Sequence, residues 1–176
     1  MATLYTIGHS TRTLEELVEA LHAHTIQTLV DIRSFPMSRR SPYFNRENLE
    51  KALPTADIQY VWMKTLGGRR KKIRDDSPNV GLRSLSFRNY ADYTLTGEFQ
   101  NAAAELVKLA EHSRTAYMCA ERVYFRCHRL LVSDYLVAHG HEVLHIDATG
   151  PVRAHQLTSE ARMVDGQLIY HGDRLL

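Results

Sequence analysis

Long apolar runs are missing from this sequence, and so is a basic and then apolar leader after Met1. A helix needs roughly 20 consecutive apolar residues to cross a bilayer, and a secretory signal needs a charged start followed by an apolar segment. We therefore expect a soluble, cytoplasmic protein without a membrane partner. With 176 residues, 44% of them hydrophobic and 24% charged, the chain has the size of one domain that buries its own core.

Cysteine is scarce, because Cys119 and Cys127 are the two cysteines of the chain. Two are too few for a disulfide scaffold, and in a reducing cytoplasm such thiols are free, metal-bound or redox-active. Their spacing is not that of a Cys-x-x-Cys dithiol, which disfavours a thioredoxin-like protein. Six positions after Cys119, where a phosphotyrosine-phosphatase-like loop needs an arginine, the residue is Phe125. That phosphatase mechanism is excluded.

Glycine-rich phosphate motifs are missing as well. Gly8 is the one glycine near the first strand-to-helix turn, which is far short of a dinucleotide fingerprint or a P-loop. Ser10 and Thr11, at the entrance of the first predicted helix, can still donate to a phosphate.

Acidic residues are missing from two stretches, although the net charge of the whole chain is only +2. Residues 32–46 hold four arginines and residues 58–74 hold six basic residues, so ten of the 22 basic residues lie in these acid-free stretches. If the two stretches meet in space, their surface attracts phosphate or another anion. Solvated loop charge is the alternative interpretation of the second stretch.

The pattern of apolar residues predicts an α/β fold. A strand-like run at residues 3–7 is followed by a capping box, Thr13 with Glu16, that opens a helical stripe. A buried strand at residues 28–32 completes a β-α-β unit, which places its strands parallel with a right-handed crossover. We predict a single three-layer domain over residues 1–176, with a mostly parallel central sheet and helices on both faces.

The rest of the chain continues this alternation. Further strands are predicted at residues 58–62, 115–119, 142–146 and 167–170, and further helices near 46–53, 87–94, 98–112, 130–137 and 158–163. Residues 67–85 have Gly, Pro, Asn and many charges but no apolar period, which predicts a mobile basic loop that can act as a lid.

The most informative segment is residues 119–129, which place both cysteines beside a carboxylate, an imidazole and guanidinium groups. A strand-to-helix turn of this kind is where open α/β sheets bind ligands. Cys127, just before a predicted helix, is the better nucleophile because backbone NH groups there favour a thiolate. The predicted catalytic residues are Cys119, Glu121, Cys127 and His128, and the predicted substrate-binding residues are His9, Ser10, Asp31, Arg33, Arg39 and Arg129. Arg126 is an alternative to Arg129.

Several segments together resemble one family: Thr6-Ile7-Gly8-His9-Ser10, Asp31-Ile32-Arg33-Ser34-Phe35-Pro36, Leu66-Gly67-Gly68, Cys119-Ala120-Glu121 and Cys127-His128-Arg129. The chain resembles the Domain of Unknown Function 488 family nearly from end to end. The similarity includes residues 155–158, where Gln156 stands in place of the family's more usual proline. The resemblance implies an α/β domain with a site at these motifs and no established biochemical role.

Three functions fit the pattern. The first is an enzyme that acts on an anionic small molecule, a nucleotide or a nucleic-acid-derived substrate through the cysteine segment. The second is a redox protein or a metal-binding one, in which Cys119, Cys127 and His128 hold a transition metal, zinc or iron, as cofactor, with His9, His145 or His155 as a further donor. The third is nucleic-acid binding through Arg39, Arg40, Arg69, Arg70, Lys71 and Lys72, with Tyr43, Phe44 and Trp62 stacking on bases.

Overall fold

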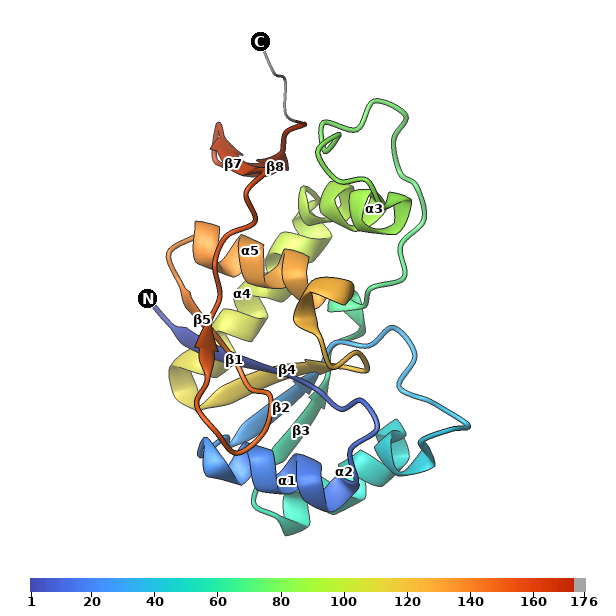
Figure 1. The fold of residues 1–176 in the computed structure, drawn as a ribbon, viewed down its shortest axis with the longest axis vertical. Coiled ribbons are helices and arrows are strands. Elements are labelled where there is room, and N and C mark those ends of the chain that lie inside the picture. Colours follow the sequence, from blue (N-terminus) through green and yellow to red (C-terminus); the bar gives the residue numbers. More distant parts are fainter. Residues whose placement is uncertain (173–176) are drawn as a thin grey trace.

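The computed structural model describes residues 1–172, and a six-stranded, mostly parallel sheet runs through its centre (Figure 1). The strand order is β3-β2-β4-β1-β5-β6, and β6 alone runs antiparallel to its neighbour. The strands of this sheet are β1 (Thr3–Gly8), β2 (Thr28–Asp31), β3 (Gln59–Trp62), β4 (Thr115–Cys119), β5 (Glu142–His145) and β6 (Arg153–Ala154). The predicted parallel sheet is confirmed.

Helices cover both faces of this sheet. Two helices, α1 (Leu14–Ala23) and α2 (Arg46–Thr55), lie on one face, and α4 (Gly97–His112) and α5 (Arg129–Ala138) lie on the other (Figure 1). A further helix, α3 (Leu85–Thr94), packs with α4 and α5. The buried residues form two hydrophobic clusters, one on each side of the sheet, and neighbouring residues of β1 belong to different clusters. This is the predicted three-layer α/β arrangement.

Short helical turns and one long loop connect these elements. The turns are the 3-10 helices η1 (Pro42–Phe44), η2 (Lys64–Leu66) and η3 (Tyr124–Arg126). Residues 67–84 contain neither helix nor strand, as predicted for the basic loop, and the lid function stays a prediction. Within residues 1–172, no helix combines the length and the apolar character needed to cross a membrane.

Most predicted elements are confirmed, but the helix predicted near residues 158–163 is wrong. Strand β7 (Ala161–Val164) pairs there with β8 (Gln167–Tyr170) as an antiparallel hairpin. The two turn residues, Asp165 and Gly166, both have positive φ, which is the backbone of a tight two-residue hairpin turn. The turn chemistry of Asp-Gly therefore overrides the weak helical pattern before it.

The chain leaves β1 and β4 toward opposite faces of the sheet. After β1 it enters α1 on one face, and after β4 it enters α5 on the other, although β1 and β4 are hydrogen-bonded neighbours. Such a switch point at the carboxyl ends of parallel strands is the usual ligand-binding place in open α/β sheets. Gly8, the last residue of β1, allows a close approach here, because a Cβ atom on it would lie 1.9 Å from the carbonyl oxygen of Glu121.

Gly8→Ala should therefore destabilise the fold. The added methyl group has to push the loop after β4 away, and overpacking of this kind costs about 1–3 kcal/mol. The measurement is the free energy of unfolding from urea titration. The matched control is Gly97→Ala, because no atom lies within 4 Å of the added Cβ at that position. The control should be as stable as the wild type or slightly more so. Equal stability of the two variants would contradict the close packing of Gly8.

Candidate functional site

The two cysteines lie side by side, with their Sγ atoms 2.8 Å apart and both thiols free. Cys119 is the last residue of β4, and Cys127 lies between η3 and α5. Cys119 is only 3% exposed, whereas Cys127 is half-buried. The predicted cysteine segment thus folds back on itself and forms a thiol pair that has one inner and one outer member.

Arg129 fixes the inner thiol from within the protein. Its side chain is 1% exposed, and its Nε donates to the Sγ of Cys119 at 3.1 Å. One terminal nitrogen donates to Oγ1 of Thr6 at 2.9 Å, and the other donates to the carbonyl oxygens of Glu121 and Arg122 at 2.5 and 2.9 Å. A substrate-binding function was predicted for Arg129. The structure instead directs its donors to the protein, so that it positions the thiols.

The thiol pair favours one negative charge, on Cys127. Burial raises the pKa of Cys127, but hydrogen bonds from the Cys119 thiol and from His128, together with the charge of Arg129, outweigh this effect and lower it to about 4. The backbone N–H of Arg129, at the first residue of α5, also points at the Cys127 sulfur, at 3.4 Å. Burial and the neighbouring Cys127 sulfur raise the pKa of Cys119 well above its usual range, so Cys119 keeps its proton.

A cavity of about 320 Å³ opens beside the thiols. Its wall includes both cysteines and Tyr90, and residues from four segments surround them, namely the loop after β2, the loop at Gly68, the start of α3 and the segment between β4 and α5. Three guanidinium-bearing residues line it: Arg33, Arg69 and Arg126. Glu121 is the one acidic residue in its wall, so the cavity has a net excess of positive charge.

Arg33 is braced against this wall by buried partners. The carboxylate of Asp31, which is fully buried, accepts from its Nε at 2.9 Å and its Nη2 at 2.6 Å, and also accepts from the Tyr60 hydroxyl at 2.5 Å. Nη1 of Arg33 lies 3.2 Å from Nε2 of His9, whose Nδ1 lies 3.0 Å from the carbonyl oxygen of Ser10. Burial lowers the pKa of His9 to about 4, so the ring is neutral and accepts from Arg33. Asp31 and His9 therefore orient Arg33.

His128 lies in the cavity wall with one ring nitrogen already engaged. Its Nε2 lies 2.8 Å from the carbonyl oxygen of Ile32 and donates to it, so the hydrogen bond that His128 gives to Cys127 comes from Nδ1. A Cβ atom on Gly68 would lie 2.5 Å from this Nδ1, so a glycine is needed there. His128 is therefore a hydrogen-bond partner of the Cys127 sulfur, and its function as a base stays a prediction.

Other predicted site residues lie farther from the thiols. Glu121 directs its backbone carbonyl toward Arg129, and its side chain is exposed at the edge of the cavity. Ser10 has a positive φ of 50° and follows His9 in the turn after β1. Arg39 is exposed and does not belong to the cavity wall. The predicted catalytic group therefore comes together at Cys119, Cys127 and His128, with Glu121 at its rim.

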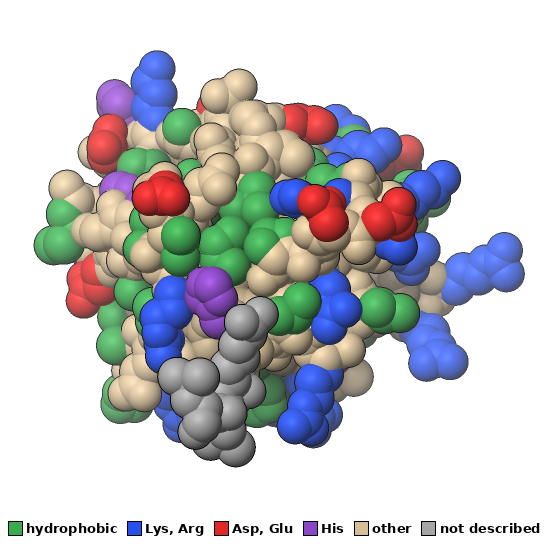
Figure 2. All heavy atoms as spheres, turned by 90° about the horizontal axis from the view of Figure 1, so that it is seen from above, with side chains coloured by type: hydrophobic (Ala, Val, Ile, Leu, Met, Phe, Trp, Pro, Cys, Tyr) green, Lys and Arg blue, Asp and Glu red, His purple; other side chains and the backbone are tan. Residues whose placement is uncertain are grey.

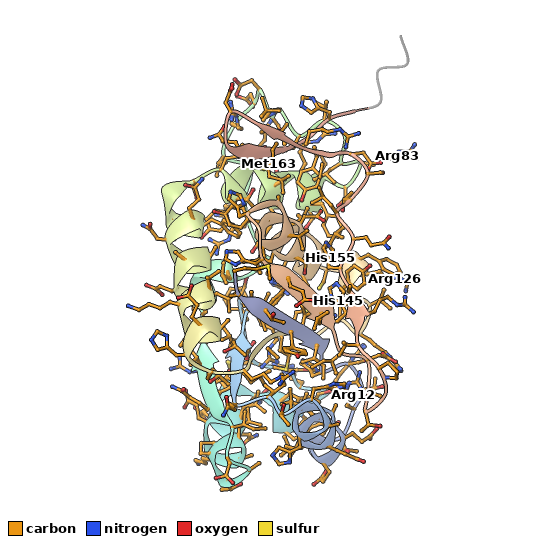
Figure 3. All side chains as sticks on the ribbon, turned by 90° about the vertical axis from the view of Figure 1, so that its left-hand side faces the viewer. Arg12, Arg83, Arg126, His145, His155 and Met163 are labelled. Carbon is orange, nitrogen blue, oxygen red and sulfur yellow. The ribbon has the colours of Figure 1, made fainter. Side chains whose placement is uncertain are left out.

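A buried chain of polar groups, which no sequence pattern predicts, lies behind Arg129. Oγ1 of Thr6 lies 2.8 Å from Nδ1 of His145, Nε2 of His145 lies 2.9 Å from Nδ1 of His155, and Nε2 of His155 lies 2.8 Å from the Asp134 carboxylate. Figure 3 shows the two histidines close together. Each group donates to the next, from Arg129 to the carboxylate, when each ring carries one proton.

The same carboxylate holds the C-terminal hairpin. Asp134 also accepts from the backbone N–H and the hydroxyl of Thr158 and from the hydroxyl of Tyr170 in β8. The sequence suggests His145 and His155 only as further metal donors, because isolated histidines in a sequence carry no sign of their partners. The structure places both of them in this chain, which joins β1, β5, α5 and the hairpin.

The metal-binding alternative finds no support in the donor geometry. Among residues 1–172, no group of three or more His, Cys, Asp or Glu side chains is arranged to hold a metal ion. The place beside the two sulfur atoms that a cation would take is filled by the guanidinium of Arg129. Nε2 of His128 is occupied by its hydrogen bond to the carbonyl oxygen of Ile32 and is not available to a metal ion.

The buried histidines predict that stability falls in mild acid. Burial lowers the pKa of His145 to about 3, with further lowering by His155 and Arg129, and burial lowers the pKa of His9 to about 4. Below the ordinary histidine pKa of about 6.5, the unfolded chain binds protons that the folded protein does not bind. Each histidine should then remove about 1.4 kcal/mol of stability per pH unit as the pH falls toward about 4.

Urea unfolding at several pH values between about 7 and about 4.5 tests this dependence. His145→Asn should make the slope shallower, because one of the two buried rings is gone. Replacement of the exposed His171 by Asn is the control and should keep the wild-type slope. An unchanged slope in His145→Asn would show that this histidine is not buried in its neutral form.

Comparison with known proteins was made for the whole sequence. The family model described as Domain of unknown function DUF488 matches residues 13–136. No curated protein and no solved structure matches the chain. The matched range contains both cysteines, Arg129 and Asp134, and it covers more than half of the sequence. The chain belongs to the family of the domain of unknown function DUF488.

Proposed function

We propose that this protein is a cytoplasmic thiol enzyme that acts on an anionic substrate, with the Cys127 thiolate as nucleophile. The observation that supports this most is the thiol pair itself, in which the outer sulfur carries the charge and faces a cationic cavity. A thiolate is the reactive form of cysteine, and low-pKa cysteines beside arginine and a helix start are typical of catalytic sites.

Positive charge around the cavity supports the anionic substrate. Arg69 and Arg126 are exposed in its wall and supply this charge, whereas Arg33 is buried and its charge is paired with Asp31. A second hollow of about 750 Å³ adjoins the cavity through shared residues and adds Lys64 and Lys71. Seen from above, basic side chains project farthest on the right of the view, and others lie at the top left, the lower left and the bottom (Figure 2). Phosphate-bearing molecules, nucleotides and nucleic-acid fragments included, are substrates of matching charge.

The neighbouring groups have separate tasks in this proposal. The proton of Cys119 is shared with the Cys127 sulfur and keeps that thiolate in place between turnovers. Arg129 donates to Cys119 and holds the pair in position as charge leaves the nucleophile. His128 donates a hydrogen bond to the Cys127 sulfur and holds that thiolate at the cavity wall.

Alkylation by iodoacetamide tests the nucleophile. In the wild type, one thiol should react at a nearly constant rate between about pH 5.5 and about pH 8, because Cys127 is ionised throughout this range. In Cys119→Ala the thiolate loses its hydrogen-bond donor, so the rate should fall in acid and rise with pH. Cys127→Ser should lose the fast reaction and keep its fold, as circular dichroism will show. A wild-type rate that increases tenfold per pH unit up to about pH 8 would contradict the proposal.

A second candidate function is nucleic-acid binding through Arg39, Arg40, Arg69, Arg70, Lys71 and Lys72. The hollow that includes Lys64, Arg69 and Lys71 favours it. The prediction that Phe44 stacks on bases is wrong, because Phe44 is fully buried against His9. Arg70 is also occupied, since it donates to the backbone carbonyls of Thr65 and Gly67 and stacks on Tyr93.

Salt dependence tests this second function. The probe is a labelled single-stranded oligonucleotide, and its affinity should fall as salt rises because phosphate contacts release counterions. The double variant Arg69→Gln with Lys71→Gln should reduce the slope of log affinity against log salt by about one to two units. Binding that is indifferent to salt, or a slope unchanged in this variant, would exclude the hollow as a nucleic-acid site. Arg162→Gln with Lys108→Gln is a charge-matched control outside the hollow.

A further inference from the structure

We propose that the two cysteines work as one dithiol, which exchanges with anionic disulfides and closes a Cys119–Cys127 disulfide in each cycle. This inference rests on the proposed function, because it uses the same Cys127 thiolate and the same cationic cavity. It goes further by naming the electrophile, a disulfide sulfur, and by giving Cys119 a chemical function of its own.

The positions of the sulfur atoms support a bond between them. They lie 2.8 Å apart, and a disulfide bond of about 2.0 Å needs them to approach by less than about 1 Å. Both cysteines lie at the ends of regular elements, with β4 before the pair and α5 after it, and residues 120–126 link them as a short loop.

The difference in exposure fixes the order of events. Cys127 is half-buried in the cavity wall, so an external disulfide reaches it first. Cys119 is 3% exposed and faces Cys127 and Arg129, so it can attack only the Cys127 sulfur, once that sulfur is part of a mixed disulfide. These are the positions of an attacking and a resolving thiol. Because Cys119 already lies against the Cys127 sulfur, it attacks the mixed disulfide before a second external thiol can do so.

The reaction balances without any further reactant. The Cys127 thiolate attacks one sulfur of the disulfide RSSR, an S–S bond forms as the old one breaks, and RS⁻ leaves. The Cys119 sulfur then attacks the Cys127 sulfur of the mixed disulfide. A second RS⁻ leaves and takes the proton of Cys119. The protein is oxidised from dithiol to disulfide, and RSSR is reduced to two thiols.

The charges around the pair select the substrate and the resting state. Arg126 and Arg69 at the cavity wall favour a disulfide that bears carboxylates, as glutathione disulfide does. Hydrogen bonds and charge that stabilise the thiolate also stabilise the reduced form over the disulfide. The dithiol is therefore the resting state, and the oxidised protein readily passes its disulfide to another thiol.

The experiment uses 5,5′-dithiobis(2-nitrobenzoate), a disulfide with two carboxylates whose released thiolate is coloured. The wild type should release two thionitrobenzoates per chain and retain none, so that its intact mass falls by two hydrogens. Cys119→Ala should release one and retain one as a stable mixed disulfide. Cys127→Ala should react slowly, because Cys119 is buried. Glutathione disulfide should give the same wild-type mass change.

Selectivity for an anionic disulfide is tested with Arg126→Gln, an exposed position. Its rate with the dicarboxylate probe should fall about tenfold at low salt. Its rate with neutral 2,2′-dithiodipyridine should stay that of the wild type. An equal loss with both probes would overturn the selectivity for anions.

The outcomes separate this inference from the proposed function. A wild type that retains one or two thionitrobenzoates, while Cys127 still alkylates rapidly in acid, would overturn the dithiol and leave the thiol enzyme standing. Slow alkylation of Cys127 in acid would overturn the proposed function itself. Loss of two hydrogens in the wild type but not in Cys119→Ala supports both.

Discussion

The burial of a single positive charge, the guanidinium of Arg129, is the constraint on which the rest of the site depends. A buried charge is costly unless it is paired and hydrogen-bonded. The guanidinium donates to a thiol, a hydroxyl and two backbone carbonyls. The negative charge that balances it must come from the thiol pair, so the ionisation of Cys127 and the burial of Arg129 stabilise each other. The thiolate is thus part of the folded structure as well as of its chemistry.

The same guanidinium begins a polar connection across the core. Through Thr6, the orientation of Arg129 depends on two buried histidines and finally on Asp134 in α5. Each link uses a donor that has no other partner in this chain of contacts, so a missing group leaves two buried polar atoms unsatisfied. This coupling explains why a carboxylate outside the cavity wall is fully buried and accepts four separate hydrogen-bond donors.

The sequence predicts the fold and the centre of the site because both follow from local patterns. Apolar periodicity identifies the strands and helices, and strand-end position brings the residues around Cys119 and Cys127 together. The sequence does not predict the function of a side chain whose partners are far away along the chain. Arg129 looks like any other arginine near a helix start, and only the fold shows that its donors point inward. The hairpin at the C-terminus was missed because two turn residues outweigh the pattern of the residues before them.

The central place of β1 has a consequence for biosynthesis. Both neighbours of this strand, β4 and β5, follow it by more than 100 residues and are translated after it. Thr6 therefore waits for its strand neighbours during this interval, and Asp134 is made before its partners His155, Thr158 and Tyr170. The central sheet therefore cannot form step by step as the chain is made, because β1 needs strands that are translated much later. Cys119 and Cys127 are synthesised before His145, His155 and the β7–β8 hairpin, which complete the packing behind them. Until those residues are made, the two thiols are more exposed to oxidation than in the folded protein.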